Sequence, residues 1–175
     1  WEEPPISGTR GSGTVFFSGC TLRCCYCQNR DISAGGFGRH ITTARLREIF
    51  ASLIAQGAHN INLVTPTHFL PWILPALEPK LRVPVVYNCG GYESVETLAA
   101  ELSAAPDYFP VAAAAIREMF RQTGPYVMED GLLKRGVVIR HLVLPGQLDN
   151  TRRCIDWVAE NFRPGEALFS LMSQY

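Results

Sequence analysis

The sequence predicts a parallel α/β fold, because strand-like and helix-like segments alternate along most of the chain. Short apolar runs rich in β-branched residues indicate buried strands at 14–18, 60–65, 83–88 and 137–144, and another strand begins within 167–172. The run 137–144 is nearly continuous in aliphatic residues, which is typical of a strand whose sheet is covered on both faces. Strands of this kind, separated by helices, are expected to lie parallel to one another.

Helix signals fill the intervals between these strands. Thr43 can cap a helix that Gly57 ends, and the apolar positions of this helix share one face: Leu46, Ile49, Phe50, Leu53 and Ile54. Helical segments are also expected in the proline-interrupted stretch 72–77, at 95–102, at 111–122, and from a capping Asp149 or Asn150 to Phe162. The helices 95–102 and 111–122 follow one another with no strand between them, so the alternation is interrupted at one place.

The size and composition fit a single globular domain. A chain of 175 residues and 19.4 kDa, with 47% apolar and 18% charged residues, can bury a substantial core. The 16 Lys and Arg residues balance 16 Asp and Glu residues, which argues against a polyanion-binding surface and against nucleic acid as a partner. No apolar run approaches the roughly 20 residues that span a bilayer, so no membrane attachment is expected.

Cysteine usage and the chain ends lead to two further expectations. The 6 cysteines suggest metal or redox chemistry rather than a disulfide scaffold, because a chain of this size does not need one. We therefore expect a reducing, cytoplasmic location. No secretory signal is recognisable, Trp1 is not a natural start and the chain stops abruptly at Tyr175, so we expect truncation at both ends.

The most distinctive motif is Cys20-Thr-Leu-Arg-Cys24-Cys25-Tyr-Cys27, directly after the first predicted strand. Cys20, Cys24 and Cys27 have Cys-x3-Cys-x2-Cys spacing, and three thiolates on one loop can hold three irons of a cubane [4Fe–4S] cluster. The fourth iron would lack a nearby protein ligand. This favours an enzyme over an electron carrier, since ferredoxins usually supply a fourth cysteine. A zinc site completed by His40 or Cys25 is the alternative.

With this motif the chain resembles the radical S-adenosylmethionine (SAM) enzymes. The longer stretch 7–20, together with Cys27-Gln28-Asn29, is similar to the branch of pyruvate formate-lyase activating enzyme-like proteins. The segments 62–68, 86–92 and 140–146 add to this likeness. The resemblance therefore covers most of the chain.

The resemblance implies a single radical SAM core domain over residues 1–175, folded as a partial, open (β/α)6 barrel of parallel strands. Similar proteins carry an extra strand, ending in an Asp-Phe-Lys-like segment, where the helices 95–102 and 111–122 adjoin here. We hypothesise that residues are missing from this sequence near Ala100, so that one strand of the barrel is lacking.

The resemblance also implies reductive cleavage of SAM. In that chemistry the amine and carboxylate of SAM chelate the fourth iron, and one electron produces methionine and a 5′-deoxyadenosyl radical that abstracts hydrogen from a substrate. The branch implies a glycine of a glycyl radical enzyme as the target, and flavodoxin or ferredoxin as the electron donor. Another small-molecule or peptide substrate is one alternative, and a non-catalytic iron–sulfur or zinc-binding module is another.

Polar residues after the later strands are the candidate SAM contacts. Thr65 and Thr67 stand where many relatives have a Gly-Gly-Glu-like segment that contacts the methionyl amine. Their hydroxyls or carbonyls can accept from an ammonium, or the residues can cap the next helix. Asn88 aligns with a residue that binds the SAM ribose in similar activating enzymes, or it shapes the turn before Gly90. His68 can be functional or structural.

Arg140 is a charge within an otherwise apolar strand, and a buried guanidinium needs a carboxylate partner. Strand alternation places Arg140 with Val138 and Leu142 on one face, and Ile139 and His141 on the other. The resemblance implies that Arg140, inside a barrel, reaches the methionyl carboxylate of SAM. A structural ion pair is the alternative, and His141 is interpreted as a structural histidine.

Each motif follows the carboxyl end of a predicted strand. The cysteine loop follows the first strand, and 65–68, 88–91 and 145–146 follow later ones. Parallel α/β sheets and barrels place their functional sites on that rim, so one composite site is expected. Cys89 and Cys154 are interpreted as packing residues.

Overall fold

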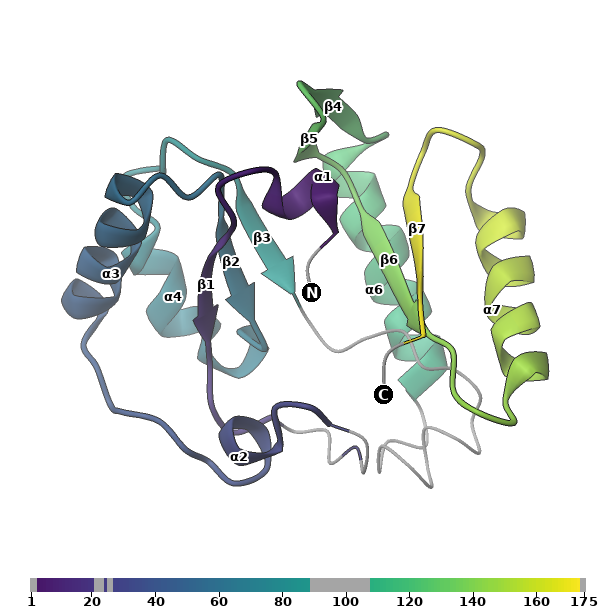
Figure 1. Ribbon diagram of the computed structural model, residues 1–175, viewed down its shortest axis with the longest axis horizontal. Helices are drawn as coiled ribbons and strands as arrows, with labels where there is room; N and C mark the ends of the chain where they lie inside the picture. Colours follow the sequence, from purple (N-terminus) through teal and green to yellow (C-terminus); the bar gives the residue numbers. More distant parts are fainter. Residues whose placement is uncertain (1–2, 21–23, 25–26, 89–107, 174–175) are drawn as a thin grey trace. The chain divides into compact units, whose positions relative to one another are not determined.

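The computed structural model describes residues 3–20, 24, 27–88 and 108–173, apart from the side chains of Tyr108 and Val111 (Figure 1). The chain divides into two compact units. The first unit consists of Trp1–Thr21, Asn29–Gly90 and Met128–Leu133, and the second of Leu22–Gln28, Gly91–Val127 and Lys134–Tyr175. Each unit contains its own hydrophobic core.

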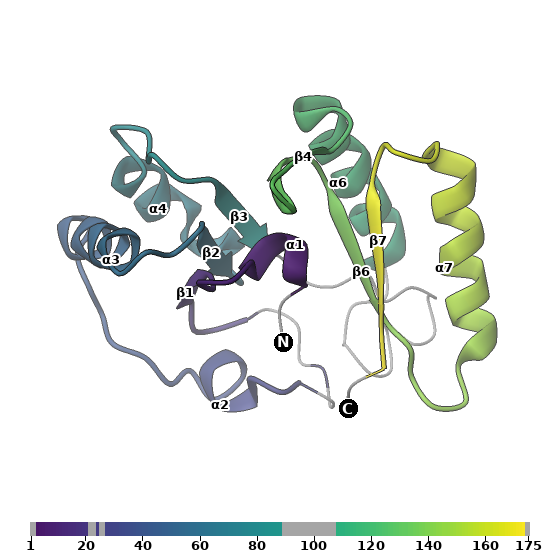
Figure 2. The same ribbon diagram turned by 45° about the horizontal axis from the view of Figure 1, so that its top comes forward.

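The first unit is built on a three-stranded parallel sheet in the order β1 (Gly13–Phe16), β2 (Ile61–Val64) and β3 (Val85–Asn88). Helices α3 (Thr43–Ala55) and α4 (Leu70–Ala76) cover one face of this sheet (Figures 1 and 2). Buried side chains from the helices and β2 form the core: Leu46, Phe50, Ile61, Leu63, Ile73 and Ala76. Three short helices complete the unit: α1 (Pro4–Ser7), α2 (Arg30–Ser33) and the 3-10 helix η1 (Thr67–Phe69).

Helix α3 begins one residue before the predicted start. Thr42 is the N-cap residue, and its side chain accepts from the N–H of Arg45 at 3.1 Å. Thr43, predicted as the cap, is the first helical residue, and its hydroxyl donates to the carbonyl of Trp72. The predicted end is confirmed, because the helix stops just before Gly57, whose φ of +97° suits glycine alone.

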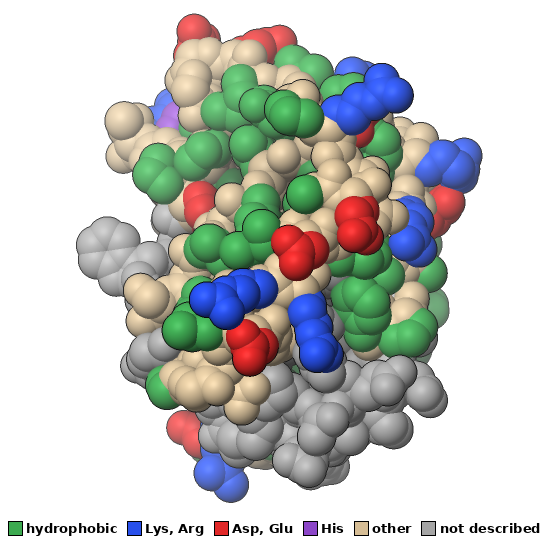
Figure 3. Space-filling view, turned by 90° about the vertical axis from the view of Figure 1, so that its right-hand side faces the viewer, with side chains coloured by type: hydrophobic (Ala, Val, Ile, Leu, Met, Phe, Trp, Pro, Cys, Tyr) green, Lys and Arg blue, Asp and Glu red, His purple; other side chains and the backbone are tan. Residues whose placement is uncertain are grey.

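The second unit pairs β6 (Val138–Leu142) with β7 (Leu168–Met172) in parallel. Helices α6 (Tyr108–Thr123) and α7 (Leu148–Asn161) pack against one face of this pair. Its buried core brings together five side chains: Ile116, Val137, Ile139, Cys154 and Phe162. Figure 3 views the side of this unit that carries α7, where acidic and basic side chains are intermixed.

Helix α7 begins earlier than the sequence suggested. Gln147 is its N-cap residue, because the first helical bond runs from the N–H of Thr151 to the Gln147 carbonyl. The side chain of Gln147 makes no cap bond. The prediction that Asp149 or Asn150 caps the helix is therefore wrong. Asp149 instead pairs with Arg152 at 3.1 Å, and Asn150 is buried.

A two-stranded sheet of β4 (Val127–Glu129) and β5 (Leu132–Arg135) was not predicted. The residues between the strands, Asp130 and Gly131, have φ values of +51° and +74°. Two left-handed residues of this kind form the tight turn that matches the twist of a β-hairpin. The Asp-Gly pair was a usable signal, but the flanking strands are too short to show alternation.

The parallel strands confirm the predicted α/β class. Five of the seven described strands form parallel sheets of three and two members, which agrees with part of a radical SAM barrel but does not amount to six strands in a closed ring. The predicted helix 95–102 and the hypothesised missing strand near Ala100 lie outside the described residues. In the described part of the chain, no helix has the length and apolar character needed to cross a membrane.

Candidate functional site

The carboxyl ends of β1, β2 and β3 bring three segments to one edge of the first sheet. Residues 18–20 follow β1, residues 65–68 follow β2, and Asn88 ends β3. The N–H of Phe17 donates to the carbonyl of Val64 at 3.0 Å, and the N–H of Thr65 donates to that of Asn88 at 2.8 Å. For these three strands the prediction that the motifs follow strand ends is confirmed.

Thr65 turns the chain sharply at the end of β2. Its φ of +59° is left-handed, and a β-branched residue adopts this conformation at a cost of about 1–3 kcal/mol. Strain of this kind clusters at binding and catalytic sites. Neither η1 nor α4 has a side-chain bond at its N-cap, so the alternative in which Thr65 and Thr67 cap the next helix is not found.

Thr67 is held by Tyr87, a residue that sequence reasoning missed. The hydroxyl of Tyr87 donates to Oγ1 of Thr67 at 2.7 Å. Thr67 keeps its own hydroxyl proton for another acceptor, because a hydroxyl both donates and accepts. Tyr87 lies within the segment 86–92 that carries part of the family likeness, but nothing in the chain spacing predicts this contact.

His68 connects the loop after β2 to the loop after β1. Its Nε2 lies 2.7 Å from the backbone oxygen of Ser18. The imidazole also packs on the ring of Phe69, with centroids 4.4 Å apart. The side chain is thus part of the candidate edge rather than of the core beneath α3 and α4.

A second residue that sequence reasoning missed is Asn62, in the middle of β2. Its neighbours Ile61 and Leu63 point into the core beneath the helices, so Asn62 points to the opposite face of the sheet. The strand register places Asn88 on that same face, opposite α3 and α4. Asn62 is only 2% exposed. A polar residue interrupting an apolar strand was the available signal, as it was for Arg140.

The three cysteines of the motif are partly exposed thiols. Cys20 belongs to the first unit, whereas Cys24 and Cys27 belong to the second, where the N–H of Cys27 donates to the Cys24 carbonyl at 3.2 Å. Among the residues that the structure describes, no three His, Cys, Asp or Glu side chains gather closely enough to hold a metal ion. The grouping of these three cysteines as one ligand set therefore rests on their spacing in the sequence. Cys25, the alternative zinc ligand, lies outside the described residues.

Arg140 and His141 occupy opposite faces of β6, as alternation predicted. Ile139 and His141 are buried on the face covered by α6 and α7, and Arg140 lies beside Ser170 of β7 on the opposite face. Nε2 of His141 is 3.1 Å from Oγ1 of Thr151, and the imidazole is 1% exposed. The interpretation of His141 as a structural histidine is confirmed.

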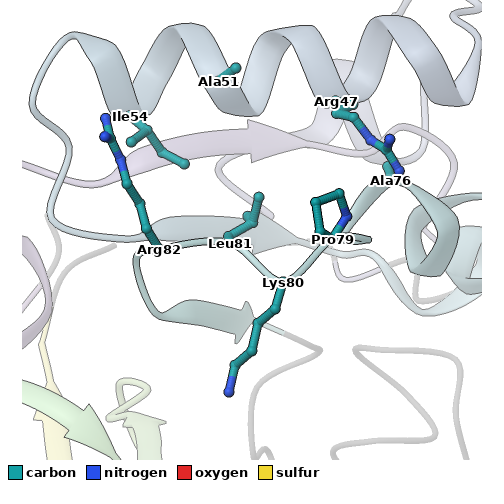
Figure 4. Close-up of a pocket in the computed structure, with 8 residues that line it drawn as sticks. All are labelled: Arg47, Ala51, Ile54, Ala76, Pro79, Lys80, Leu81 and Arg82. Atoms are coloured by element: carbon teal, nitrogen blue, oxygen red, sulfur yellow. The ribbon is translucent and has the colours of Figure 1, made fainter.

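A shallow groove of about 360 Å³ lies elsewhere in the first unit, between α3 and the residues that precede β3 (Figure 4). It is near the amino end of β3, whereas the candidate site is at the carboxyl end, where Asn88 lies. Apolar and basic side chains line it: Arg47, Ala51, Ile54, Ala76, Pro79, Lys80, Leu81 and Arg82. Arg47 donates to the carbonyl of Pro75 at 2.6 Å, and Lys80 points away from α3. The groove is thus separate from the candidate site.

Comparison with known proteins identifies a family. A family model described as the radical SAM superfamily matches residues 14–158. A protein of Methanocaldococcus jannaschii, described as uncharacterized, is 30% identical over an alignment of 183 positions that covers 94% of this chain. The alignment covers 53% of that relative, so the chain spans about half its length.

Members of the radical SAM superfamily use a [4Fe–4S] cluster and SAM. The donor set of this chain fits such a cluster, because Cys20, Cys24 and Cys27 can each offer a thiolate to one iron. Cys154 is fully buried in the second core, which confirms its interpretation as a packing residue and leaves it unsuitable as a ligand. Cys89, the other predicted packing cysteine, lies outside the described residues.

Proposed function

The chain belongs to the radical SAM superfamily, and from this premise we propose that it forms the core of an enzyme that cleaves SAM reductively. The observation that carries the proposal is the family match over residues 14–158, within which the motif Cys-x3-Cys-x2-Cys follows the first strand. A cluster held by three cysteines leaves one iron for SAM, as open metal sites leave a position for substrate.

We assign the three irons to Cys20, Cys24 and Cys27. When bound, the cluster supplies one electron that splits SAM into methionine and a 5′-deoxyadenosyl radical. The chain's contribution is to hold the thiols, to orient SAM and to exclude water and stray thiols from the radical. All three thiols are partly exposed, which leaves room for iron and sulfide to reach them.

The first unit supplies the proposed contacts to the amine and ribose of SAM. Thr65 and Thr67 are at the same sheet edge as Cys20, and their hydroxyl and carbonyl oxygens can accept from the methionyl ammonium. The strain at Thr65 supports a binding role, since it gives the fold no evident benefit. Asn88 ends β3 on the face opposite α3 and α4, where its amide can bond the ribose hydroxyls.

Arg140 is proposed to bind the methionyl carboxylate. It lies on the face of β6 opposite α6 and α7, and the fixed fork of a guanidinium matches a carboxylate. Arg140→Met should weaken SAM binding by roughly 10–100-fold, the loss expected for a charge-assisted bond of about 1.5–3 kcal/mol. Arg140→Lys should recover part of that loss. Equal SAM affinity in both variants and the unaltered protein would exclude the assignment.

A six-stranded barrel in a single domain is also part of the proposal. The alignment with the M. jannaschii protein runs over 183 residues, longer than the 175 residues of this chain, so the relative carries residues that this chain lacks. We place the lacking strand near Ala100. A tryptic digest of the natural protein should contain no peptide with the mass of residues 83–117, because the additional residues either lengthen that peptide or add a cleavage site. A matching mass would contradict the missing strand.

The proposed substrate is a glycine of a partner protein, which the radical converts to a glycyl radical. The likeness of segments 7–20, 62–68 and 86–92 to activating enzymes supports this, with flavodoxin or ferredoxin as the reductant in the cytoplasm. Another small molecule or peptide is the second candidate substrate. A non-catalytic iron–sulfur or zinc module is the third reading of the cysteine motif.

Anaerobic reconstitution of the full-length protein tests the proposal. After incubation with iron and sulfide, the protein should be brown and should convert SAM to 5′-deoxyadenosine under a strong reductant. Stoichiometric zinc without SAM cleavage would support the binding module instead. A glycyl radical signal in electron paramagnetic resonance, seen only when a candidate partner is added, would establish the substrate class. SAM cleavage without that signal, but with hydrogen abstraction from another compound, would make that compound the substrate in place of a glycine.

A further inference from the structure

The peptide group between Ser18 and Gly19 is held from both of its polar ends. Its carbonyl oxygen, on Ser18, is 2.7 Å from Nε2 of His68. Its N–H, on Gly19, donates to the carbonyl of Ile32 in α2 at 3.2 Å. Because the carbonyl can only accept, Nε2 of His68 must carry the proton and donate. This peptide leads directly into Cys20.

The peptide needs such support because of the residue that follows it. Gly19 has a φ of +82°, and glycine adopts either sign of φ at similar energy. The peptide plane before it can therefore rotate at little cost unless its polar atoms are engaged. A rotation there would redirect Cys20, whose thiol we assign to the cluster. A methyl group added at Gly19 would lie 3.7 Å from Nε2 of His68, so the imidazole lies close to Gly19 as well as to Ser18.

His68 is itself well anchored. Its ring packs on Phe69, and the N–H of Phe69 donates to the carbonyl of Pro66 at 2.9 Å. The start of the same loop is tied to β3 through the N–H of Thr65 at 2.8 Å. The hydroxyl of Tyr87 holds Thr67 from β3 at 2.7 Å. His68 thus extends from a segment fixed by its neighbours.

From these contacts we infer that His68 is a positioning residue for the cysteine loop: it fixes the Ser18–Gly19 peptide and thereby the direction of Cys20. This inference rests on the proposed cluster ligation by Cys20. The loop after β2 then has two tasks, since its threonines are the proposed SAM contacts and its histidine holds the ligand loop.

The expected consequence of losing His68 is a less firmly held cluster. Residues that orient metal ligands typically change metal affinity by roughly 10–100-fold when replaced. His68→Leu in the reconstituted full-length protein should therefore release iron to a chelator at least about tenfold faster. His68→Gln should restore slow release, because the amide nitrogen of glutamine can donate from nearly the position of Nε2.

Ser12→Ala is the matched control, since it removes a side-chain hydrogen bond to Asn60 of 2.7 Å at the amino ends of β1 and β2, away from Ser18 and His68. Its iron release should equal that of the unaltered protein. The thermal unfolding midpoint separates positioning from general destabilisation: His68→Gln and His68→Leu should unfold at similar temperatures but release iron at different rates. Similar release from His68→Leu and Ser12→Ala, or no rescue by glutamine, would overturn the inference.

A second measurement does not depend on the cluster or on variants. Nitrogen-15 spectra of the histidines in the reduced protein should show His68 as the Nε2-protonated tautomer with a slowly exchanging ring proton. The Nδ1-protonated tautomer would refute the contact with Ser18, even if the protein cleaves SAM. Conversely, the expected tautomer in a protein that binds no iron would leave His68 in place and refute the proposed function alone.

Discussion

The backbone N–H of Thr65 donates to the carbonyl oxygen of Asn88 across 2.8 Å, joining the ends of β2 and β3 at the point where Thr65 takes a left-handed conformation. The strand pairing and the buried Pro66 that follows hold the residue in this conformation. A β-branched side chain is among the least favourable choices for such a position. The identity of Thr65 therefore points to a requirement other than stability.

Replacing Thr65 with glycine should separate stability from binding. Relief of left-handed strain is worth about 1–2 kcal/mol, and the greater freedom of unfolded glycine costs about 0.5–1 kcal/mol. Thr65→Gly should thus be as stable as the unaltered protein, or more stable by up to about 1.5 kcal/mol, yet bind SAM more weakly. Anaerobic thermal unfolding and equilibrium dialysis with SAM measure the two effects.

Asp130→Gly is the control for this experiment, because Asp130 is the other described non-glycine residue with a positive φ and lies in the hairpin turn. It should change stability no more than Thr65→Gly does, because aspartate tolerates a left-handed conformation better than a β-branched residue, and it should leave SAM binding unchanged. Unchanged SAM affinity in Thr65→Gly would remove Thr65 from the SAM site.

The cysteine assignment predicts opposite results for two substitutions. Cys24→Ala should lose the cluster, because only two of the three assigned thiolate ligands, Cys20 and Cys27, would remain. Cys154→Ala should keep its iron but lose roughly 1–2 kcal/mol of stability, because Cys154 is fully buried in the second core. Iron and sulfide analysis with the absorption near 400 nm gives the first result, and denaturant unfolding gives the second. Full iron content in Cys24→Ala would contradict the assignment.

Much of the fold could be predicted because its signals are local. Apolar β-branched runs located the strands, and alternation along β6 separated Arg140 from His141 before any contact was known. Helix starts were less predictable: Thr42 and Thr43 are both good caps, and the choice depends on where the chain enters the helix. The hairpin at Asp130 was missed because its strands are short.

The contacts within the candidate site could not be predicted in the same way. The bonds of Tyr87 to Thr67 and of His68 to Ser18 join residues 20 and 50 positions apart. They depend on the register of three strands, which local patterns leave open. Asn62 is different, since a polar residue inside an apolar strand is visible in the sequence itself.

A pH prediction concerns Glu118 on the exposed surface of α6. Hydrogen bonds from Arg121 and then from Gln122 lower the pKa of Glu118 from 4.5 to about 2. A lowered pKa means that the stabilisation is complete above the ordinary value of 4.5 and is lost as the pH falls toward 2. Arg121→Gln should move the pKa of Glu118 back up toward 4.5, as followed by carbon-13 NMR of the carboxyl group. A pKa that stays in place would assign the shift to another group.

Thr151 should matter for stability but not for catalysis. Its Oγ1 is 3.1 Å from Nε2 of His141, which is 1% exposed, so Thr151→Val would take a hydrogen-bond partner from a buried imidazole. Loss of such a partner costs about 1–3 kcal/mol. Thr151→Ser retains the hydroxyl and should lose less than Thr151→Val in denaturant unfolding. Both variants should cleave SAM at the unaltered rate, because His141 lies on the face of β6 opposite Arg140. A large loss of SAM cleavage in folded Thr151→Val would place His141 in the active site instead of the core.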